Sequence, residues 1–269
     1  MTERELTNKE KFYVDNLYTT LEFIIKTIRE QESKSMYDKT LTETRLNLRK
    51  EGKITINFLG FVDKIKYLED NDGKYLVAII DYKTGYVPTT LDNINYGLHL
   101  QLPVYIYLTK RGLHKDIKIT GFYLQKILNG KTVDSDSFEE DSKKALKLDG
   151  YSIDSEEELI KFDRTYAKSD VIKGMATTSK GFAHYAKLFN DSDIAKIDRI
   201  VDERINEVVE AIWKGDFPIN PKRVKGELIG CEFCKYKEIC YRREEDIVDL
   251  EYKTREDILG DDLNAKVDE

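Results

Sequence analysis

Residues 75–83 have the sequence Tyr-Leu-Val-Ala-Ile-Ile-Asp-Tyr-Lys and indicate the central strand of a sheet. The first six form a compact apolar run, which is typical of a strand buried on both faces. The turn sequence Asn-Asp-Gly at 71–73 precedes this run and predicts a hairpin with an earlier strand. Because residues i and i+2 of a strand point to the same face, Asp81 and Lys83 project together where the run ends.

The flanking sequence predicts the other elements of a mixed α/β core. Apolar residues at helical spacing indicate helices, and alternating or compact apolar runs indicate strands. In chain order we expect a helix over 6–31, strands over 41–49, 54–67 and 75–82, a helix over 91–110, a strand over 117–127, and a helix from a cap at Ser192 to about Trp213. This order implies a central sheet flanked by helices. Residues 134–190 are polar and predict no clear element.

The composition is that of a globular protein with a heavily charged surface. The chain has 269 residues, of which 40% are hydrophobic and 35% charged, enough for one large domain or two small ones. No apolar run approaches the ~20 residues of a membrane span, and the N-terminus has no apolar signal region. We therefore expect a cytoplasmic protein with no membrane partner. The sequence has no G-x-x-x-x-G-K-[ST], so we expect no ATP site in this chain.

Charge divides the chain into a body at 1–243 and an acidic C-terminal tail at 244–269. The tail has 11 acidic and 3 basic residues, a net charge of −8, which leaves +1 for the body. Residues 213–243 have a local excess of +4. This basic stretch is either a solvated surface loop or a rim that follows a phosphate backbone.

A second carboxylate precedes the strand at 75–83. Asp63 follows Gly-Phe-Val at 60–62, and hairpin pairing can bring Asp63 beside Asp81. Two carboxylates at one point suit Mg²⁺ or Mn²⁺, and without a cation they would repel each other. Such a metal activates water for phosphodiester hydrolysis, and Lys83 could hold the developing negative charge. The alternative is an exposed strand end with ordinary charged residues.

Gln101 and Tyr105 add two polar groups to one face of the helix expected over 91–110. They lie four residues apart, so they are neighbours on that face, among many leucines. A helix that only packed against a core would not need them. The alternative is a partly exposed helix with two polar tips at its surface.

Three segments together resemble the PD-(D/E)XK nucleases, and most closely the RecB-type branch with the nuclease domain of AddB/RexB helicase–nuclease subunits. The segments are Gly-Phe-Val-Asp at 60–63, Ile-Asp-Tyr-Lys-Thr-Gly at 80–85 and Gly-Leu-His-Leu-Gln-Leu-Pro-Val-Tyr at 97–105. The resemblance implies a restriction-endonuclease-like core. It also implies a metal-dependent DNA exonuclease that acts in double-strand break repair and recombination with a helicase–nuclease partner subunit.

The resemblance also implies residue roles. Mg²⁺ or Mn²⁺ would be held by Asp63, Asp81 and the backbone carbonyl of Tyr82. Lys83 would be the catalytic lysine, and Gln101 and Tyr105 would support the substrate and this lysine. Glu43 would bind a second cation or a metal-bound water. Glu43 is otherwise an ordinary surface residue. Two other functions stay open for the chain: a catalytically weak or inactive DNA-binding or scaffolding module, and a zinc-stabilised protein-interaction domain.

Cys231, Cys234 and Cys240 are the only cysteines and lie within ten residues. In an intracellular protein such spacing favours a metal over disulfides, with zinc and iron–sulfur clusters both possible. The resemblance points to the [4Fe-4S] cluster of the AddB branch, whose fourth cysteine lies far upstream. That cysteine and the family's upstream histidine are absent here. We therefore expect a chain that lacks the family's N-terminal segment and whose cluster is incomplete or absent.

Overall fold

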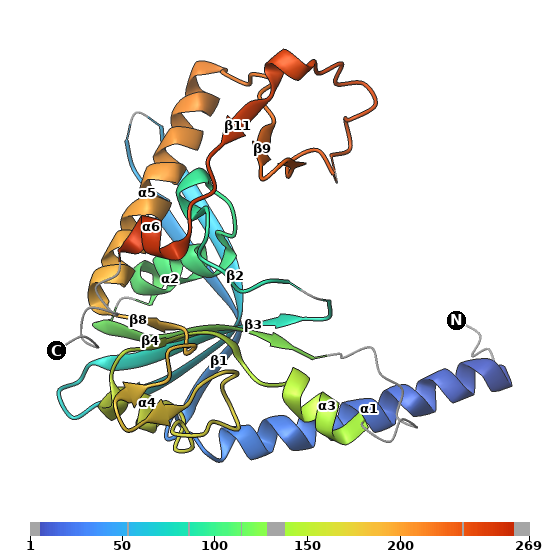
Figure 1. The fold of residues 1–269 in the computed structure, drawn as a ribbon, viewed down its shortest axis with the longest axis vertical. Coiled ribbons are helices and arrows are strands. Elements are labelled where there is room, and N and C mark those ends of the chain that lie inside the picture. Colours follow the sequence, from blue (N-terminus) through green and yellow to red (C-terminus); the bar gives the residue numbers. More distant parts are fainter. Residues whose placement is uncertain are drawn as a thin grey trace.

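The computed structural model describes residues 6–52, 54–85, 87–113, 115–127, 138–232 and 234–260. Figure 1 shows a sheet with helices on both faces. The helices are α1 (Asn8–Glu32), α2 (Gln101–Gly112), α3 (Phe138–Ala145), α4 (Glu156–Phe162), α5 (Asp191–Lys214) and α6 (Arg255–Leu259), with 3₁₀ turns η1 (Ile94–Tyr96) and η2 (Glu244–Asp246). None of the helices in the described ranges is long and apolar enough to cross a membrane.

The central sheet has six strands in the order β1-β2-β3-β4-β5-β8. The strands are β1 (Lys39–Lys50), β2 (Ile56–Glu69), β3 (Tyr75–Lys83), β4 (Ile117–Lys126), β5 (Asp149–Ile153) and β8 (Leu188–Phe189). The β3–β4 and β5–β8 pairs are parallel, and the other three pairs are antiparallel. The predicted mixed sheet flanked by helices is therefore confirmed.

Strand β3 is buried on both faces, as its apolar run predicts. Val77 and Ile79 belong to one hydrophobic cluster, which also contains side chains of α2, α5 and α6. Ala78 and Ile80 belong to a second cluster, which contains side chains of α4. Because Asp81 follows the same alternation as Val77 and Ile79, its side chain lies on the α2 face.

A glycine in β2 allows α2 to lie close to the sheet. A Cβ atom at Gly60 would come within 2.4 Å of Leu108 Cδ1, so any larger residue would displace the Leu108 side chain. Leu108 is itself fully buried. The close approach fixes α2, and with it Gln101 at the start of α2, relative to the strands that carry Asp63 and Asp81.

Two helix starts differ from the prediction. Helix α2 begins at Gln101 and not at 91, because Asn93, Gly97 and His99 all have positive φ angles, which end regular helix geometry. Pro103 lies in the first turn of α2, where a missing N–H costs nothing. The cap of α5 is Asn190 and not Ser192, since the Asn190 side chain accepts a hydrogen bond from the N–H of Asp193.

Two parts of the chain extend from the sheet (Figure 1). The first is the N-terminal part of α1. The second is the C-terminal half of α5 with a small sheet of β9 (Lys222–Val224), β10 (Glu227–Leu228) and β11 (Val248–Leu250). The short strands β6 (Thr177–Thr178) and β7 (Gly181–Phe182) form a separate hairpin.

The acidic segment expected as a tail contains structured elements. Strand β11 pairs in parallel with β9, and α6 buries Leu259 in the main hydrophobic cluster. Residues 261–269 lie outside the described residues. The described part of the segment therefore contributes both to the small sheet and to the core.

Candidate functional site

Four side chains from β3 and α2 form a connected polar group. The Lys83 ammonium lies 2.5 Å from Asp81 Oδ2 and donates a hydrogen bond to Gln101 Oε1 at 2.7 Å. Gln101 Nε2 donates to Asp81 Oδ1 at 2.9 Å and to the Tyr105 hydroxyl at 3.1 Å. The structure thus joins four of the residues that the sequence singled out, from a strand end and from the first turns of a helix.

Asp63 joins this group through the backbone of β3. The pair Lys64–Ile80 is the last regular pair of the β2–β3 ladder at this end, so Asp63 and Asp81 occupy the next positions of the two strands. The N–H of Tyr82 donates a hydrogen bond to Asp63 Oδ2 at 2.8 Å. Since the N–H and C=O of one strand residue point to the same neighbouring strand, the Tyr82 carbonyl is directed to the Asp63 side.

Burial controls the electrostatics of this group. Asp81 is only 2% exposed. Burial raises the pKa of Asp81 above its usual value and the charge of Asp63 raises it further, although Lys83 acts in the opposite direction. Burial also raises the pKa of the Tyr105 hydroxyl, with contributions from both carboxylates. The group therefore concentrates negative charge that a cation would stabilise.

The donor set fits a hard divalent cation. Asp81 Oδ2 is buried and lies 2.5 Å from the Lys83 ammonium. Mg²⁺ prefers oxygen ligands and is commonly held by one or two carboxylates while it keeps several waters. Asp63, Asp81 and the Tyr82 carbonyl can supply such oxygens. Within the described ranges no three His, Cys, Asp or Glu side chains converge on one point.

Glu43 lies opposite Asp63 in the neighbouring strand, but its backbone is unusual. The Glu43–Asp63 position lies between two regular pairs of the β1–β2 ladder, Thr42–Lys64 and Thr44–Val62. Glu43 has a φ of 46°, in the left-handed region that costs a residue with a side chain about 1–3 kcal/mol. Its side chain is exposed and is not gathered with the two aspartates. Such strain is typical of functional positions.

We expect the substitution Glu43→Gly to leave the free energy of unfolding unchanged or to raise it by up to about 1 kcal/mol, because glycine adopts positive φ without strain. The matched variant Thr44→Gly lies at a regular strand position, and its free energy of unfolding should be lower by about 1 kcal/mol. Urea denaturation of both variants measures the difference. An equal loss in the two variants would mean that Glu43 is not strained.

The three cysteines of the segment 231–240 are close in sequence but do not gather in space. The three thiols are free and partly exposed, and among the described residues they do not converge into a metal-binding group. A [4Fe-4S] cluster needs four thiolates or equivalent ligands, and the chain has three cysteines. The residues present therefore do not fit a complete cluster.

The sequence patterns did not identify a second charged group, Glu32 with Lys64 and Lys66, on the opposite face of the sheet. Both lysines are buried. The signal available was the spacing of two lysines at i and i+2 within a strand, which puts both on one face. Lysine is almost never fully buried, so the sequence alone predicts that Lys64 and Lys66 lie on a solvent-exposed face.

Two acids and a lysine lie at the ends of adjacent strands, beside a glutamine and a tyrosine from α2. The family model of the PD-(D/E)XK nuclease superfamily matches residues 1–241, so the chain belongs to that superfamily. The membership confirms the resemblance that the three motif segments carry.

Individual relatives point to one branch of the superfamily. The B-type subunit of the ATP-dependent helicase/deoxyribonuclease of Carboxydothermus hydrogenoformans is 26% identical over 196 residues, which are 70% of this chain and 18% of that protein. The B-type subunit from Alkaliphilus oremlandii is 26% identical over 217 residues, 77% of this chain and 19% of that protein. The chain thus spans under a fifth of the length of these relatives, and both support a nuclease role.

Proposed function

We propose that the chain is a Mg²⁺-dependent DNA exonuclease domain that hydrolyses phosphodiester bonds at the Asp63–Asp81–Lys83 group. The observation that carries the proposal is the buried Asp81 carboxylate, which lies beside the charge of Asp63 and 2.5 Å from the Lys83 ammonium. A hydrolytic site on an anionic backbone needs this combination of charges.

The residues have distinct roles in this proposal. Asp63, Asp81 and the Tyr82 carbonyl hold the metal, which when bound lowers the pKa of water and neutralises phosphate charge. The Lys83 ammonium, which contacts Gln101 and Asp81, stabilises the charge that develops on the scissile phosphate. Tyr105 orients Gln101 through their hydrogen bond. Glu43, one strand further, binds a second cation or a metal-bound water.

The direct test is degradation of linear DNA with and without metal. We expect the purified chain to shorten end-labelled linear DNA with Mg²⁺ or Mn²⁺, and EDTA to stop the reaction, because the proposed mechanism relies on a bound metal to activate water and to neutralise phosphate charge. Covalently closed circular single-stranded DNA should resist. Cleavage of circles would contradict the exonuclease assignment. DNA binding without metal-dependent cleavage would favour an inactive DNA-binding module instead.

The part formed by the C-terminal half of α5 and the small sheet has the features of a nucleic-acid surface. It exposes the rings of Trp213, Phe217, Tyr236 and Tyr241. The same segment carries a charge excess of +4 over residues 213–243. Bases of a single strand stack on exposed aromatic rings, and basic side chains follow the phosphates. We assign this surface to the strand that enters the site.

We expect the double substitution Tyr236→Ala with Tyr241→Ala to weaken binding of single-stranded DNA by about tenfold or more, since each stacked base contributes about 1–3 kcal/mol. The matched control is Tyr18→Ala, which removes an equally exposed ring from α1. Fluorescence anisotropy at fixed salt measures both. An equal loss in the control would place the binding surface elsewhere.

The names of the relatives carry the proposal further. They are subunits of ATP-dependent helicase/deoxyribonucleases. We therefore propose that this domain acts with a helicase–nuclease partner in double-strand break repair and recombination.

A further inference from the structure

A second charged group lies on the same face of the central sheet as Asp81, two strands away. Asp81 pairs with Leu124 of β4, and Leu124 pairs with Asp149 at the start of β5. Leu124 is a member of the main hydrophobic cluster, on the α2 face. Asp149 follows the alternation of Tyr151 and Ile153, which belong to the same cluster. Because neighbouring strands lie ~4.8 Å apart, the backbone of Asp149 is about 10 Å from that of Asp81 along this row.

Asp149 holds two lysines that come from other parts of the chain. Lys173 Nζ donates a hydrogen bond to Asp149 Oδ2, and Lys187 Nζ donates one to Asp149 Oδ1, each at 2.8 Å. Lys187 also donates to the carbonyl of Thr89 at 2.9 Å, in the segment that follows β3. Burial raises the pKa of Asp149, but the hydrogen bonds from both lysines outweigh burial and hold it below its usual value. The carboxylate stays charged, so the group has a single excess positive charge.

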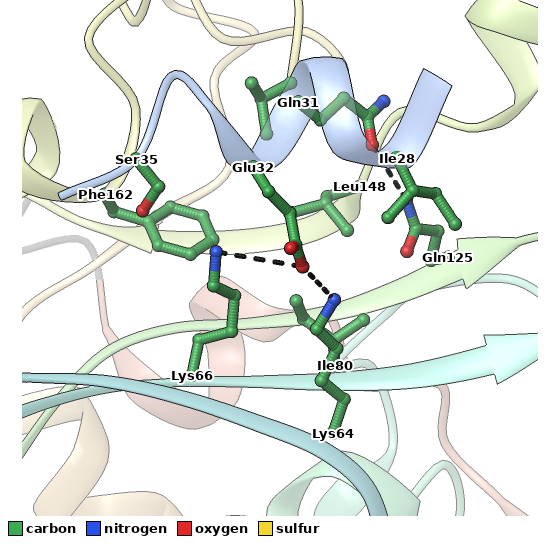
Figure 2. A pocket seen from close by; sticks show the side chains of 11 residues that line it. Ile28, Gln31, Glu32, Ser35, Lys64, Lys66, Ile80, Gln125, Leu148 and Phe162 are labelled. Carbon is green, nitrogen blue, oxygen red and sulfur yellow. Dashed lines mark hydrogen bonds and ion pairs between the residues drawn. The ribbon is translucent and has the colours of Figure 1, made fainter. Parts of the chain in front are cut away.

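These two lysines remain accessible to a ligand, unlike the lysines on the other face of the sheet. The side chains of Lys173 and Lys187 are 61% and 39% exposed. Those of Lys64 and Lys66 are 7% and 6% exposed and lie with Glu32 beneath α1 (Figure 2). An ammonium has three N–H donors. In hydrogen bonds with the described residues Lys173 uses one donor and Lys187 uses two, so each can donate to a further acceptor.

An open groove of about 1010 Å³ begins beside this group. Lys187 and Thr89 line it, and so does the exposed ring of Tyr185. Four acidic side chains also line the groove: Asp92, Asp154, Glu156 and Glu256. Asp154 and Glu156 follow the far end of β5, ~17 Å from its start, and Asp92 accepts hydrogen bonds within the fold. The end of the groove at Lys187 is therefore the end suited to an anion.

We propose, on the basis of the nuclease function proposed above, that Lys173 and Lys187 together bind one backbone phosphate of the DNA strand that is cleaved at Asp81. A stacked strand advances ~3.4 Å per nucleotide, so a separation of about 10 Å corresponds to about two or three nucleotides from the scissile phosphate. Contacts of this kind fix the register of a strand without reading its sequence. Asp149 is a positioning residue, because it holds both ammonium groups at the edge of the groove.

The first test measures DNA binding in EDTA, so it does not require cleavage. We expect Lys173→Met with Lys187→Met to weaken binding of a fluorescent single-stranded oligonucleotide by about tenfold, because hydrogen bonds between charged groups are lost. The slope of log K against log salt concentration should become less negative by about 0.7, the value for one phosphate. Lys34→Met is the matched control, since Lys34 pairs with Asp170 at 2.9 Å beside the second hydrophobic cluster, and it should change neither quantity.

The second test locates the phosphate with end-labelled oligonucleotides that each carry one uncharged methylphosphonate. During degradation, wild type should stop at the methylphosphonate itself and should also pause when it lies about two or three nucleotides from the bond being cleaved. Lys173→Met should lose the pause and keep the stop, with a raised KM and an unchanged kcat. Lys173 lies in a turn and is mostly exposed, so this variant is expected to fold even if the double variant does not.

The outcomes separate this phosphate site from the nuclease function itself. If wild type cleaves DNA and the variants match its affinity, salt slope and pause, the two lysines bind no phosphate although the nuclease assignment stands. If wild type binds DNA without cleaving it, weaker and less salt-dependent binding by the double variant supports the phosphate site while the nuclease function fails. A wild-type protein that binds no DNA would overturn both.

Discussion

Asp81→Ala and Lys83→Ala will each abolish Mg²⁺-dependent cleavage of linear DNA, with a loss in kcat/KM of at least ~10³-fold. Removing one preorganised group that stabilises charge in a transition state already costs ~10²–10³ in rate. Asp81 is in addition a proposed metal ligand, and the proposed mechanism relies on that metal to activate water. Single-turnover degradation of end-labelled DNA measures the loss directly.

The two variants should differ in metal binding. Asp81→Ala removes a carboxylate and should weaken binding of Mn²⁺, whereas Lys83→Ala removes the competing ammonium from Asp81 Oδ2 and should strengthen it. Asp72→Ala, in the exposed turn before β3, is the matched control and should keep both activity and metal affinity. Equal cleavage by wild type and Asp81→Ala would reject the assigned roles, provided that circular dichroism reports folded protein.

The strands were predictable because their patterns are local. The apolar run of β3 and the turn before it give both the strand and its hairpin, and β1, β2 and β4 agree with the expected ranges to within a few residues. Residues 138–190 contain α3, α4 and the strands β5 to β8. These elements are short, so no periodicity has room to develop, and their pairing depends on contacts distant in sequence.

The contacts within the candidate site follow from the same periodicities. A strand puts Asp81 and Lys83 on one face, and a helix puts Gln101 and Tyr105 on one face. The sequence does not predict the distance between strand β3 and helix α2, because this distance depends on the close packing that Gly60 permits. The hydrogen bond from the Tyr82 N–H to Asp63 was likewise unpredictable, because it forms only where the β2–β3 ladder ends.

The buried lysines behind β2 illustrate the opposite case. Sequence rules assign Lys64 and Lys66 to solvent, and their partner Glu32 lies more than thirty residues away on α1. Only the packing of α1 on the sheet makes these residues neighbours. A pair of lysines in a strand therefore predicts a solvent-exposed face, and this prediction fails where a helix such as α1 packs over that face.

The acidic C-terminal segment is joined to the body by a buried ion pair, and breaking it should strongly destabilise the protein. Arg255 Nη2 lies 2.7 Å from Asp193 Oδ2, and Asp193 is 1% exposed. Burial raises the pKa of Asp193 even though Arg255 opposes this, so desolvation outweighs the attraction. Such a pair contributes little net stability, but removal of one partner leaves an uncompensated buried charge.

We therefore expect Asp193→Ala to lower the free energy of unfolding by about 3–5 kcal/mol and Tm by roughly 10 °C. Part of the loss is the cap of α5, since Asp193 also accepts a hydrogen bond from the Asn190 N–H. The double variant with Arg255→Met should recover part of it, because no unpaired charge then remains. Glu256→Gln, an exposed carboxylate 3.8 Å from the same arginine, should change Tm by less than about 1 °C. If calorimetry gives Asp193→Ala the same small change in Tm as Glu256→Gln, the ion pair does not stabilise the packing of the acidic segment on the body.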